Sequence, residues 1–254
     1  MQIMTTNVYD SNAGMMATDS RWSLTWLNYV CCLDDIGFEK IERHGDFLYM
    51  FAGLGKRVQE WKDWLRSKPT GSAGQPASSS KNRALHVRSF IEGKHYCLLG
   101  RLNHRDGHSL MVWLPALSCW TTNKDARRAV NTAKTVDVYY TGGTTKFFDL
   151  GTGANNLVLV PGKEVRYEDF PQIFKEKGHV MEIDGNRKVN GPPFAKKEGA
   201  FAASNDEVLS EISGRLASGE LHASTPCEEM VRDWTDEEKK KFNEALGEAF
   251  GWKK

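Results

Sequence analysis

The sequence lacks any apolar run near the roughly 20 residues of a membrane-spanning helix, so we expect no membrane segment. Its amino end has no basic segment followed by a long apolar stretch, which argues against a secretory signal. It also lacks an excess of charge of one sign, because 34 Lys and Arg stand against 33 Asp and Glu. Nucleic-acid-binding domains usually have a basic face and a high pI, so this balance argues against that class.

Paired cysteines of CxxC type are also missing. The five cysteines are Cys31, Cys32, Cys97, Cys119 and Cys227. Their odd number and irregular spacing are typical of reduced thiols in a cytoplasmic protein. We therefore expect no zinc site, and we expect neither another metal nor a cofactor.

The remaining composition is that of one globular domain over residues 1–254, with 40% hydrophobic residues. The segment 68–82, "KPTGSAGQPASSSKN", is rich in Gly, Ser and Pro, which predicts a flexible insertion. Residues 83–198 form a middle region of mixed character. Within it, "NKDARRAVNTAK" predicts a short helix, while "VDVYYTGG" and "NLVLV" predict strands.

The first quarter of the chain predicts two hairpins and a helix. Residues 7–9 and 14–18 pair across a turn-forming segment, and residues 38–43 pair with 47–52 around "HGD". An amphipathic helix is predicted after "FAGLG", since apolar residues recur there at helical spacing. They are Leu54, Val58, Trp61, Trp64 and Leu65.

The last stretch carries helix-start signals. Ser204 with Glu207 fits a capping box, and Leu209, Ile212 and Leu216 form an apolar stripe behind it. Helical patterns continue from there to the carboxyl end.

The order of motifs between Thr5 and Ser67 resembles a known family. "TTNVYD…GMMATDSRWS", followed by "FEKIERHGDFLYMFAGLG" and a helix, resembles the proteasome β-subunit family of N-terminal-nucleophile hydrolases. Within it, the likeness is greatest to the bacterial heat-shock-locus V peptidase. The likeness resumes at "GAFAASNDEVLSEISGRLASGELHASTPCEEMVRDW". Between these stretches the middle region has diverged.

The resemblance implies an α+β fold, a four-layer αββα sandwich with an inserted middle region. It implies a threonine-type peptidase or amide hydrolase that forms a homo-oligomeric ring. Its substrates would be peptides or unfolded proteins delivered by an ATP-dependent unfoldase. Neither nucleic acid nor a membrane is expected as a partner.

The resemblance also implies a nucleophile. Thr5 becomes the first residue once residues 1–4 are lost, and its α-amine then serves as the base for its own hydroxyl. An α-amine has an ordinary pKa of roughly 7.7–8.0, and a nearby lysine ammonium lowers it further. Lys40 matches that lysine, and Asp19 of "ATDSR" would hold it by a charge-assisted hydrogen bond.

Three further residues match the family's site. The backbone N–H of Gly53 would donate to the oxyanion of the tetrahedral intermediate. Phe51 would line the pocket for the substrate residue before the cleaved bond, which favours an apolar residue. Ser204 matches a serine that assists the nucleophile, and it also fits a helix N-cap.

Departures from the family leave two alternatives open. The span from Thr5 to Asp19 is shorter than the family's first hairpin, and only Asp233 offers a loose match to a late aspartate near the nucleophile. One alternative is a catalytically inactive proteasome-like protein with a structural or interaction role. The other is a hydrolase of the same fold that acts on small amides.

Overall fold

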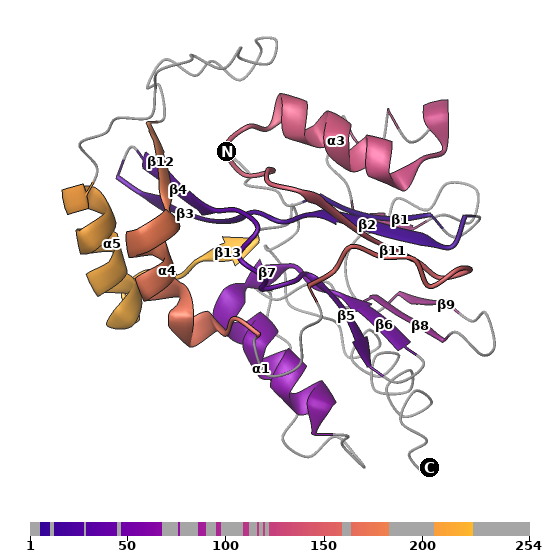
Figure 1. The fold of residues 1–254 in the computed structure, drawn as a ribbon, viewed down its shortest axis with the longest axis horizontal. Coiled ribbons are helices and arrows are strands. Elements are labelled where there is room, and N and C mark those ends of the chain that lie inside the picture. Colours follow the sequence, from indigo (N-terminus) through magenta and orange to yellow (C-terminus); the bar gives the residue numbers. More distant parts are fainter. Residues whose placement is uncertain are drawn as a thin grey trace, which may run out of the picture.

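A computed structural model describes residues 6–10, 13–27, 29–44, 47–67, 76, 86–89, 95–97, 109–111, 116, 119, 122–158, 164–182 and 206–225. Thr5, Ser204, Asp233 and all but one residue of the predicted insertion 68–82 lie outside these ranges. Within these ranges, no helix is long and apolar enough to cross a bilayer. The secondary structure is a mixture of helices and antiparallel sheets (Figure 1).

The first sheet contains the amino-terminal hairpin. Its strand order is β10 (Ser109–Met111), β1 (Asn7–Asp10), β2 (Met15–Asp19) and β11 (Thr145–Asp149). All neighbours are antiparallel, and Asn7 pairs with Thr18 in the hairpin register. The predicted first hairpin is therefore confirmed.

The second hairpin belongs to another four-stranded sheet. The order there is β5 (Ile41–His44), β6 (Phe47–Met50), β8 (His86–Ser89) and β9 (His95–Cys97). The hairpin of β5 and β6 confirms the second predicted hairpin, with strands shorter than predicted.

Alternation along the strands decides how these two sheets pack. Tyr9 and Met16 face one way and join Leu48 and Met50 in one buried cluster between the sheets. Successive strand residues point to opposite faces, so the other side of each sheet needs its own cover. Figure 1 shows α3 (Ala126–Val136) over the first sheet and α1 (Gly55–Arg66) beneath the second.

The side chains that hold these helices follow from the same alternation. Val8 and Ala17 pack against alanines of α3, among them Ala129. Tyr49 packs in the cluster that contains Trp61 of α1. The predicted helix after "FAGLG" is thus confirmed, and its buried face includes Val58, Trp61, Trp64 and Leu65.

A third sheet extends beside the other two. Its order is β12 (His179–Glu182), β4 (Tyr29–Leu33), β3 (Trp22–Trp26), β13 (Ser224–Thr225) and β7 (Gly53–Leu54). Helices α4 (Phe170–Lys177) and α5 (Asp206–Ala217), with the short 3-10 helix η1 (Tyr167–Asp169), lie beside it (Figure 1). Ile212 and Leu216 of the predicted stripe are buried in its core.

The middle region corrects two predictions. The helix within "NKDARRAVNTAK" is confirmed as α3, whose N-cap Asp125 accepts hydrogen bonds from two backbone N–H groups. The strand predicted over "VDVYYTGG" is wrong, because residues 137–143 form a series of turns after α3. Residues 156–158 of "NLVLV" are not a strand either, and 159–160 lie outside the described ranges.

Candidate functional site

A buried ion pair joins the end of β2 to the start of the second hairpin. Nζ of Lys40 lies 2.9 Å from Oδ2 of Asp19, and the two residues are 1% and 0% exposed. Burial lowers the pKa of Lys40 from its ordinary value, and the Asp19 carboxylate offsets part of that lowering. The contact that the resemblance implied between these two residues is present.

Asp19 also binds the amino-terminal segment. Its Oδ1 accepts a hydrogen bond from the backbone N–H of Thr6 at 3.1 Å, and its Oδ2 accepts one from Arg21 N–H at 3.1 Å. Both carboxylate oxygens are thus used. The residue after the predicted nucleophile is therefore linked to Lys40 through one side chain.

Of the other predicted site residues, the structure describes Gly53 and Phe51. Thr5 and Ser204 lie outside the described ranges, so their roles stay predictions. Gly53 has a φ of +112°, which glycine adopts readily, and it pairs with Thr225 of β13. Phe51 is 3% exposed and packs in the core cluster that includes α1. The roles of Gly53 and Phe51 stay predictions.

One residue that the sequence analysis missed is Asn7. Its Nδ2 donates to the Phe51 carbonyl at 3.1 Å, and its Oδ1 accepts from the Thr18 hydroxyl at 2.5 Å. The backbone N–H of Phe51 donates in turn to the Lys40 carbonyl at 2.7 Å. An uncharged polar residue at the start of β1, on the same face of the strand as Tyr9, was the signal that could have revealed it.

Arg21 of the "ATDSR" segment anchors the turns after α3. Its guanidinium makes two hydrogen bonds with the Asp34 carboxylate, at 2.8 and 2.6 Å, and its Nη1 donates to the Val138 carbonyl at 2.6 Å. Burial acts to lower the pKa of Arg21, but the hydrogen bond with Asp34 and the nearby negative charges, among them Asp34 and Asp19, together outweigh it, and the pKa is raised. Arg21 is therefore a cation held in place against residues 138 and 142 of the turns at 137–143, which we call the turn segment.

The turn segment places a hydroxyl beside the amino-terminal segment. The Thr141 and Thr6 hydroxyl oxygens lie 3.5 Å apart, and both residues are buried. The Gly142 carbonyl accepts from Ser20 N–H, and Nζ of Lys134 donates to the Gly143 carbonyl at 3.0 Å. The Thr141 hydroxyl therefore lies beside the residue that follows the predicted nucleophile, while the role of Ser204, which lies outside the described ranges, stays a prediction.

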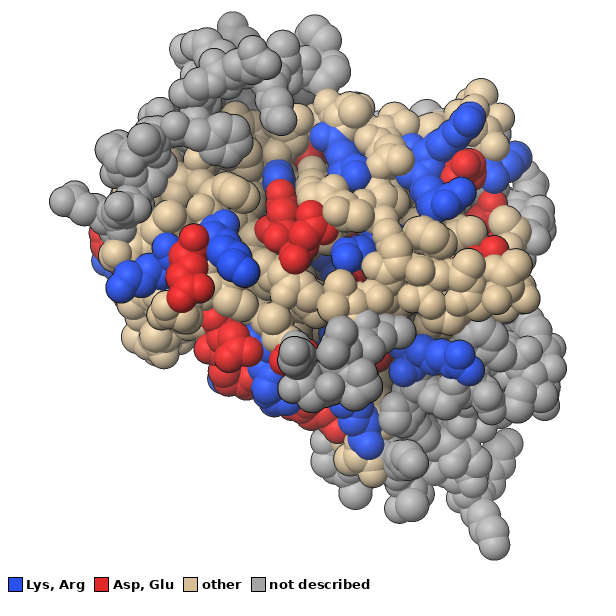
Figure 2. Space-filling view, in the orientation of Figure 1, with Lys and Arg blue, Asp and Glu red and all other residues tan. Residues whose placement is uncertain are grey.

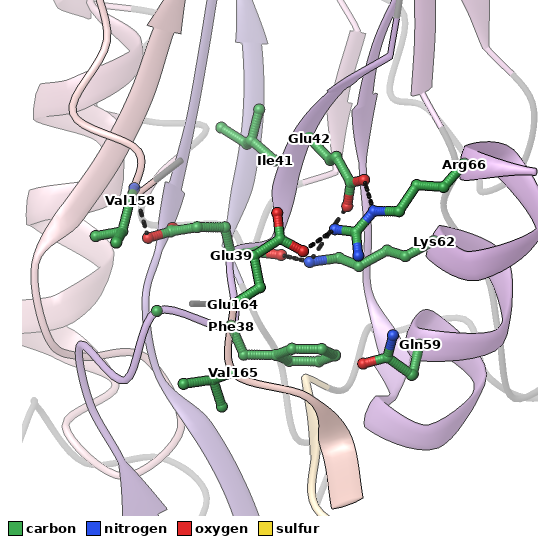
Figure 3. A pocket seen from close by; sticks show the side chains of 11 residues that line it. Phe38, Glu39, Ile41, Glu42, Gln59, Lys62, Arg66, Val158, Glu164 and Val165 are labelled. Carbon is green, nitrogen blue, oxygen red and sulfur yellow. Dashed lines mark hydrogen bonds and ion pairs between the residues drawn. The ribbon is translucent and has the colours of Figure 1, made fainter. Parts of the chain in front are cut away.

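A small pocket lies beside α1 (Figure 3). It is lined by Gly37, Phe38, Glu39, Ile41, Glu42, Gln59, Lys62, Arg66, Val158, Glu164 and Val165. Glu42 lies 3.5 Å from Nζ of Lys62 and 2.7 Å from Nε of Arg66, while Arg66 also pairs with Glu164. These opposite charges neutralise one another, and the ion pairs of Glu42 on β5 with Lys62 and Arg66 on α1 hold the helix against the second sheet. Phe51 is not among its lining residues.

Charges of both signs are interspersed over the face in Figure 2, as the balanced composition suggests. Within the described ranges, no group of three or more His, Cys, Asp or Glu side chains is arranged to hold a metal ion.

Comparison with known proteins adds no relative. No protein-family model matches the chain, no curated protein matches it, and no solved structure matches it. The geometry around Asp19 is therefore the basis for a functional assignment.

Proposed function

We propose that the protein is an amide hydrolase of the peptidase type whose nucleophile is the hydroxyl of an amino-terminal Thr5. The observation that carries the proposal is the bridge made by Asp19 between Thr6 N–H and the Lys40 ammonium. Thr5 is one peptide unit from Thr6, and consecutive Cα atoms are about 3.8 Å apart. This bridge supports a Thr5 amine close to the Lys40 charge.

The bridge also favours Thr5 over Thr6 as the nucleophile. If Thr6 were the first residue, its α-amine would lie against the Asp19 carboxylate at 3.1 Å. A carboxylate at that distance stabilises the ammonium form and raises the pKa of the amine, so at neutral pH the amine is already protonated and cannot accept the proton of the hydroxyl. With Thr5 first, the Thr6 nitrogen remains an amide.

The proposed reaction follows from this arrangement. The Thr5 hydroxyl attacks the substrate carbonyl and gives its proton to the Thr5 amine. The amine passes that proton to the leaving nitrogen as the C–N bond breaks, which leaves an ester on Thr5. Water then attacks the ester with the same amine as base, releases the acid and restores the hydroxyl.

The surrounding residues take supporting roles in the proposal. The Lys40 ammonium lowers the pKa of the Thr5 amine, and Asp19 keeps Lys40 charged despite its burial. The Gly53 N–H stabilises the oxyanion and Ser204 assists the nucleophile. Phe51 is 3% exposed in the core cluster, so the proposal gives its side chain no direct contact with the substrate.

The layering of the fold supports the same proposal. Four layers follow one another in the order α3, the sheet of β1, the sheet of β6 and α1, and the three buried clusters described above join them (Figure 1). This succession agrees with the four-layer sandwich that the resemblance implies. A homo-oligomeric ring and an ATP-dependent unfoldase are the partners that the proposal includes.

The first test is the amino terminus of the purified protein. We expect intact mass and terminal sequencing to give a chain that begins at Thr5, while Thr5→Ala keeps residues 1–4 if the removal is autocatalytic. A peptidic β-lactone then tests the nucleophile. Its ring opens onto the Thr5 hydroxyl, so the mass rises by that of the whole probe.

Thr5→Ser is the matched control, because it keeps a hydroxyl beside the amine and is expected to be labelled. Thr5→Ala is expected to remain unlabelled. A parent chain that keeps Met1 to Met4 and takes up no probe would contradict the proposal. The non-catalytic alternative would then be favoured.

A further inference from the structure

We propose that Asn7 is a positioning residue, which fixes the amino-terminal strand relative to Lys40 through the backbone of Phe51. The proposal rests on the proposed function, since it assigns Asn7 a role in aligning Thr5 with Lys40. Neither the resemblance nor the comparisons assign a role to Asn7.

The Asn7 side chain lies between two elements that are far apart in the sequence. Its amide nitrogen donates to the Phe51 carbonyl across a separation of 44 residues. Its amide oxygen accepts from Thr18, which is its partner on β2. Asn7 is 0% exposed, and it lies on the same face of β1 as Tyr9, which belongs to the cluster between the two sheets. The bridge from Asn7 to Phe51 therefore crosses the interface between the sheets.

Two connections run from the amino-terminal segment to Lys40. One passes through side chains, from Thr6 N–H to Asp19 and on to the Lys40 ammonium. The other passes from Asn7 to the Phe51 carbonyl, and from Phe51 N–H to the Lys40 carbonyl. Together they link both ends of Lys40, its ammonium and its backbone, to two adjacent residues of the amino-terminal segment, Thr6 and Asn7.

An amide side chain meets the requirements of this position. It supplies a donor for the Phe51 carbonyl and an acceptor for the Thr18 hydroxyl at the same time. An aspartate would be isosteric but would set a carboxylate oxygen against the Phe51 carbonyl oxygen. An alanine would leave a buried carbonyl and a buried hydroxyl without these partners.

The test compares Asn7→Ala and Asn7→Asp with Ser213→Ala in the full chain. Ser213 donates its hydroxyl to the Pro171 carbonyl at 2.7 Å, so its replacement removes one tertiary side-chain to backbone hydrogen bond between α5 and α4. Thr18→Val serves as a further variant, because it keeps the side-chain shape and removes the hydroxyl that donates to Asn7 and, at 3.3 Å, to the Asp19 carbonyl. The probe is the peptidic β-lactone, and labelling of Thr5 is followed by intact mass.

We expect the labelling rate at saturating probe to fall about 10- to 100-fold in both Asn7 variants, since a misplacement of about 1 Å costs up to 10²-fold. The probe concentration at half-maximal rate should stay within about twofold, because Asn7 is 0% exposed and its side chain is not available to contact the probe. Thr18→Val should show a smaller loss of rate, and Ser213→Ala should keep the rate of the parent. The midpoint of the pH profile should not move, because the Lys40–Asp19 pair remains.

The outcomes separate this inference from the function on which it rests. A parent that is labelled at Thr5, with folded Asn7 variants labelled at an equal rate, would overturn the role of Asn7 alone. If the Asn7 variants do not fold, an unchanged rate in folded Thr18→Val overturns it, and a reduced rate supports it. A parent that is never labelled overturns the proposed function and this inference together.

Discussion

The Lys40 ammonium lies 2.9 Å from the Asp19 carboxylate at a place where neither side chain reaches solvent. Water therefore contributes little to keeping either group charged. The Lys40 charge depends on Asp19, and the Asp19 charge depends on Lys40 together with the backbone N–H donors of Thr6 and Arg21. The Asp19 carboxylate thus links Thr6, Arg21 and Lys40.

Lys40→Met should destabilise the protein by about 3–5 kcal/mol, because it leaves the Asp19 carboxylate buried without its cation. The double variant Asp19→Asn, Lys40→Met should recover most of that loss, since no buried charge remains. Urea unfolding followed by circular dichroism measures both values. A double variant as unstable as the single one would contradict this reading of the pair.

Arg21→Lys should cost about 2 kcal/mol, because lysine cannot bind Asp34 through two nitrogens and also reach the Val138 carbonyl. Arg57→Lys is the matched control. Arg57 pairs with Glu60 on the exposed side of α1, and the change should stay within about 0.5 kcal/mol. Equal losses of free energy of unfolding in the two variants would show that the contacts of Arg21 contribute no more than a surface pair.

Gly142→Ala should destabilise the protein by about 1–3 kcal/mol. A Cβ atom at Gly142 would overlap the guanidinium of Arg21, which Asp34 and the Val138 carbonyl hold in place. Gly214→Ala in α5 should instead stabilise the protein by about 0.5–1 kcal/mol, because nothing lies near the added atom and alanine favours a helix. Thermal unfolding measures both shifts, and shifts of the same sign would refute the close-approach argument.

The free energy of unfolding should fall as the pH rises above about 9. Burial raises the pKa of Cys31 from 9.0 to about 12, and it also raises the pKa values of Cys32 and Tyr49. Each group keeps its proton in the folded protein after the unfolded chain has lost it. The associated stability is therefore complete below pH 9 and is lost as the pH approaches the folded-state pKa.

Cys31→Ala should make this loss of stability less steep by up to about 1.4 kcal/mol per pH unit. Urea unfolding at intervals between about pH 7.5 and pH 10.5 measures the slope against that of the parent. A Cys31→Ala slope equal to that of the parent would show that the Cys31 thiol does not contribute.

Sequence patterns predicted the elements whose cause is local. The turn-forming residues between β1 and β2 predicted their hairpin, and the spacing of Val58, Trp61 and Leu65 predicted α1. In each case the residues that form the element also form its buried face, so a short window of sequence contains the physical reason.

The failed strand prediction at residues 136–143 has a cause outside its own window. The two valines and two tyrosines there favour a strand, yet Arg21 and Ser20 bind the backbone of this segment from more than a hundred residues away. The Asp137 side chain also accepts from the Tyr140 N–H, which closes a turn. Propensity was overridden by hydrogen bonds that only the folded chain can form.

By itself the sequence determined the two hairpins, helices α1 and α3, and the apolar stripe of α5, since their periodicity and capping are local properties. Through a family resemblance it also pointed to Asp19 and Lys40. The tertiary structure alone decided that Asn7 reaches the Phe51 carbonyl and that Thr141 lies beside Thr6. Those contacts join residues 44 and 135 positions apart, and such partners come together only when the sheets pack.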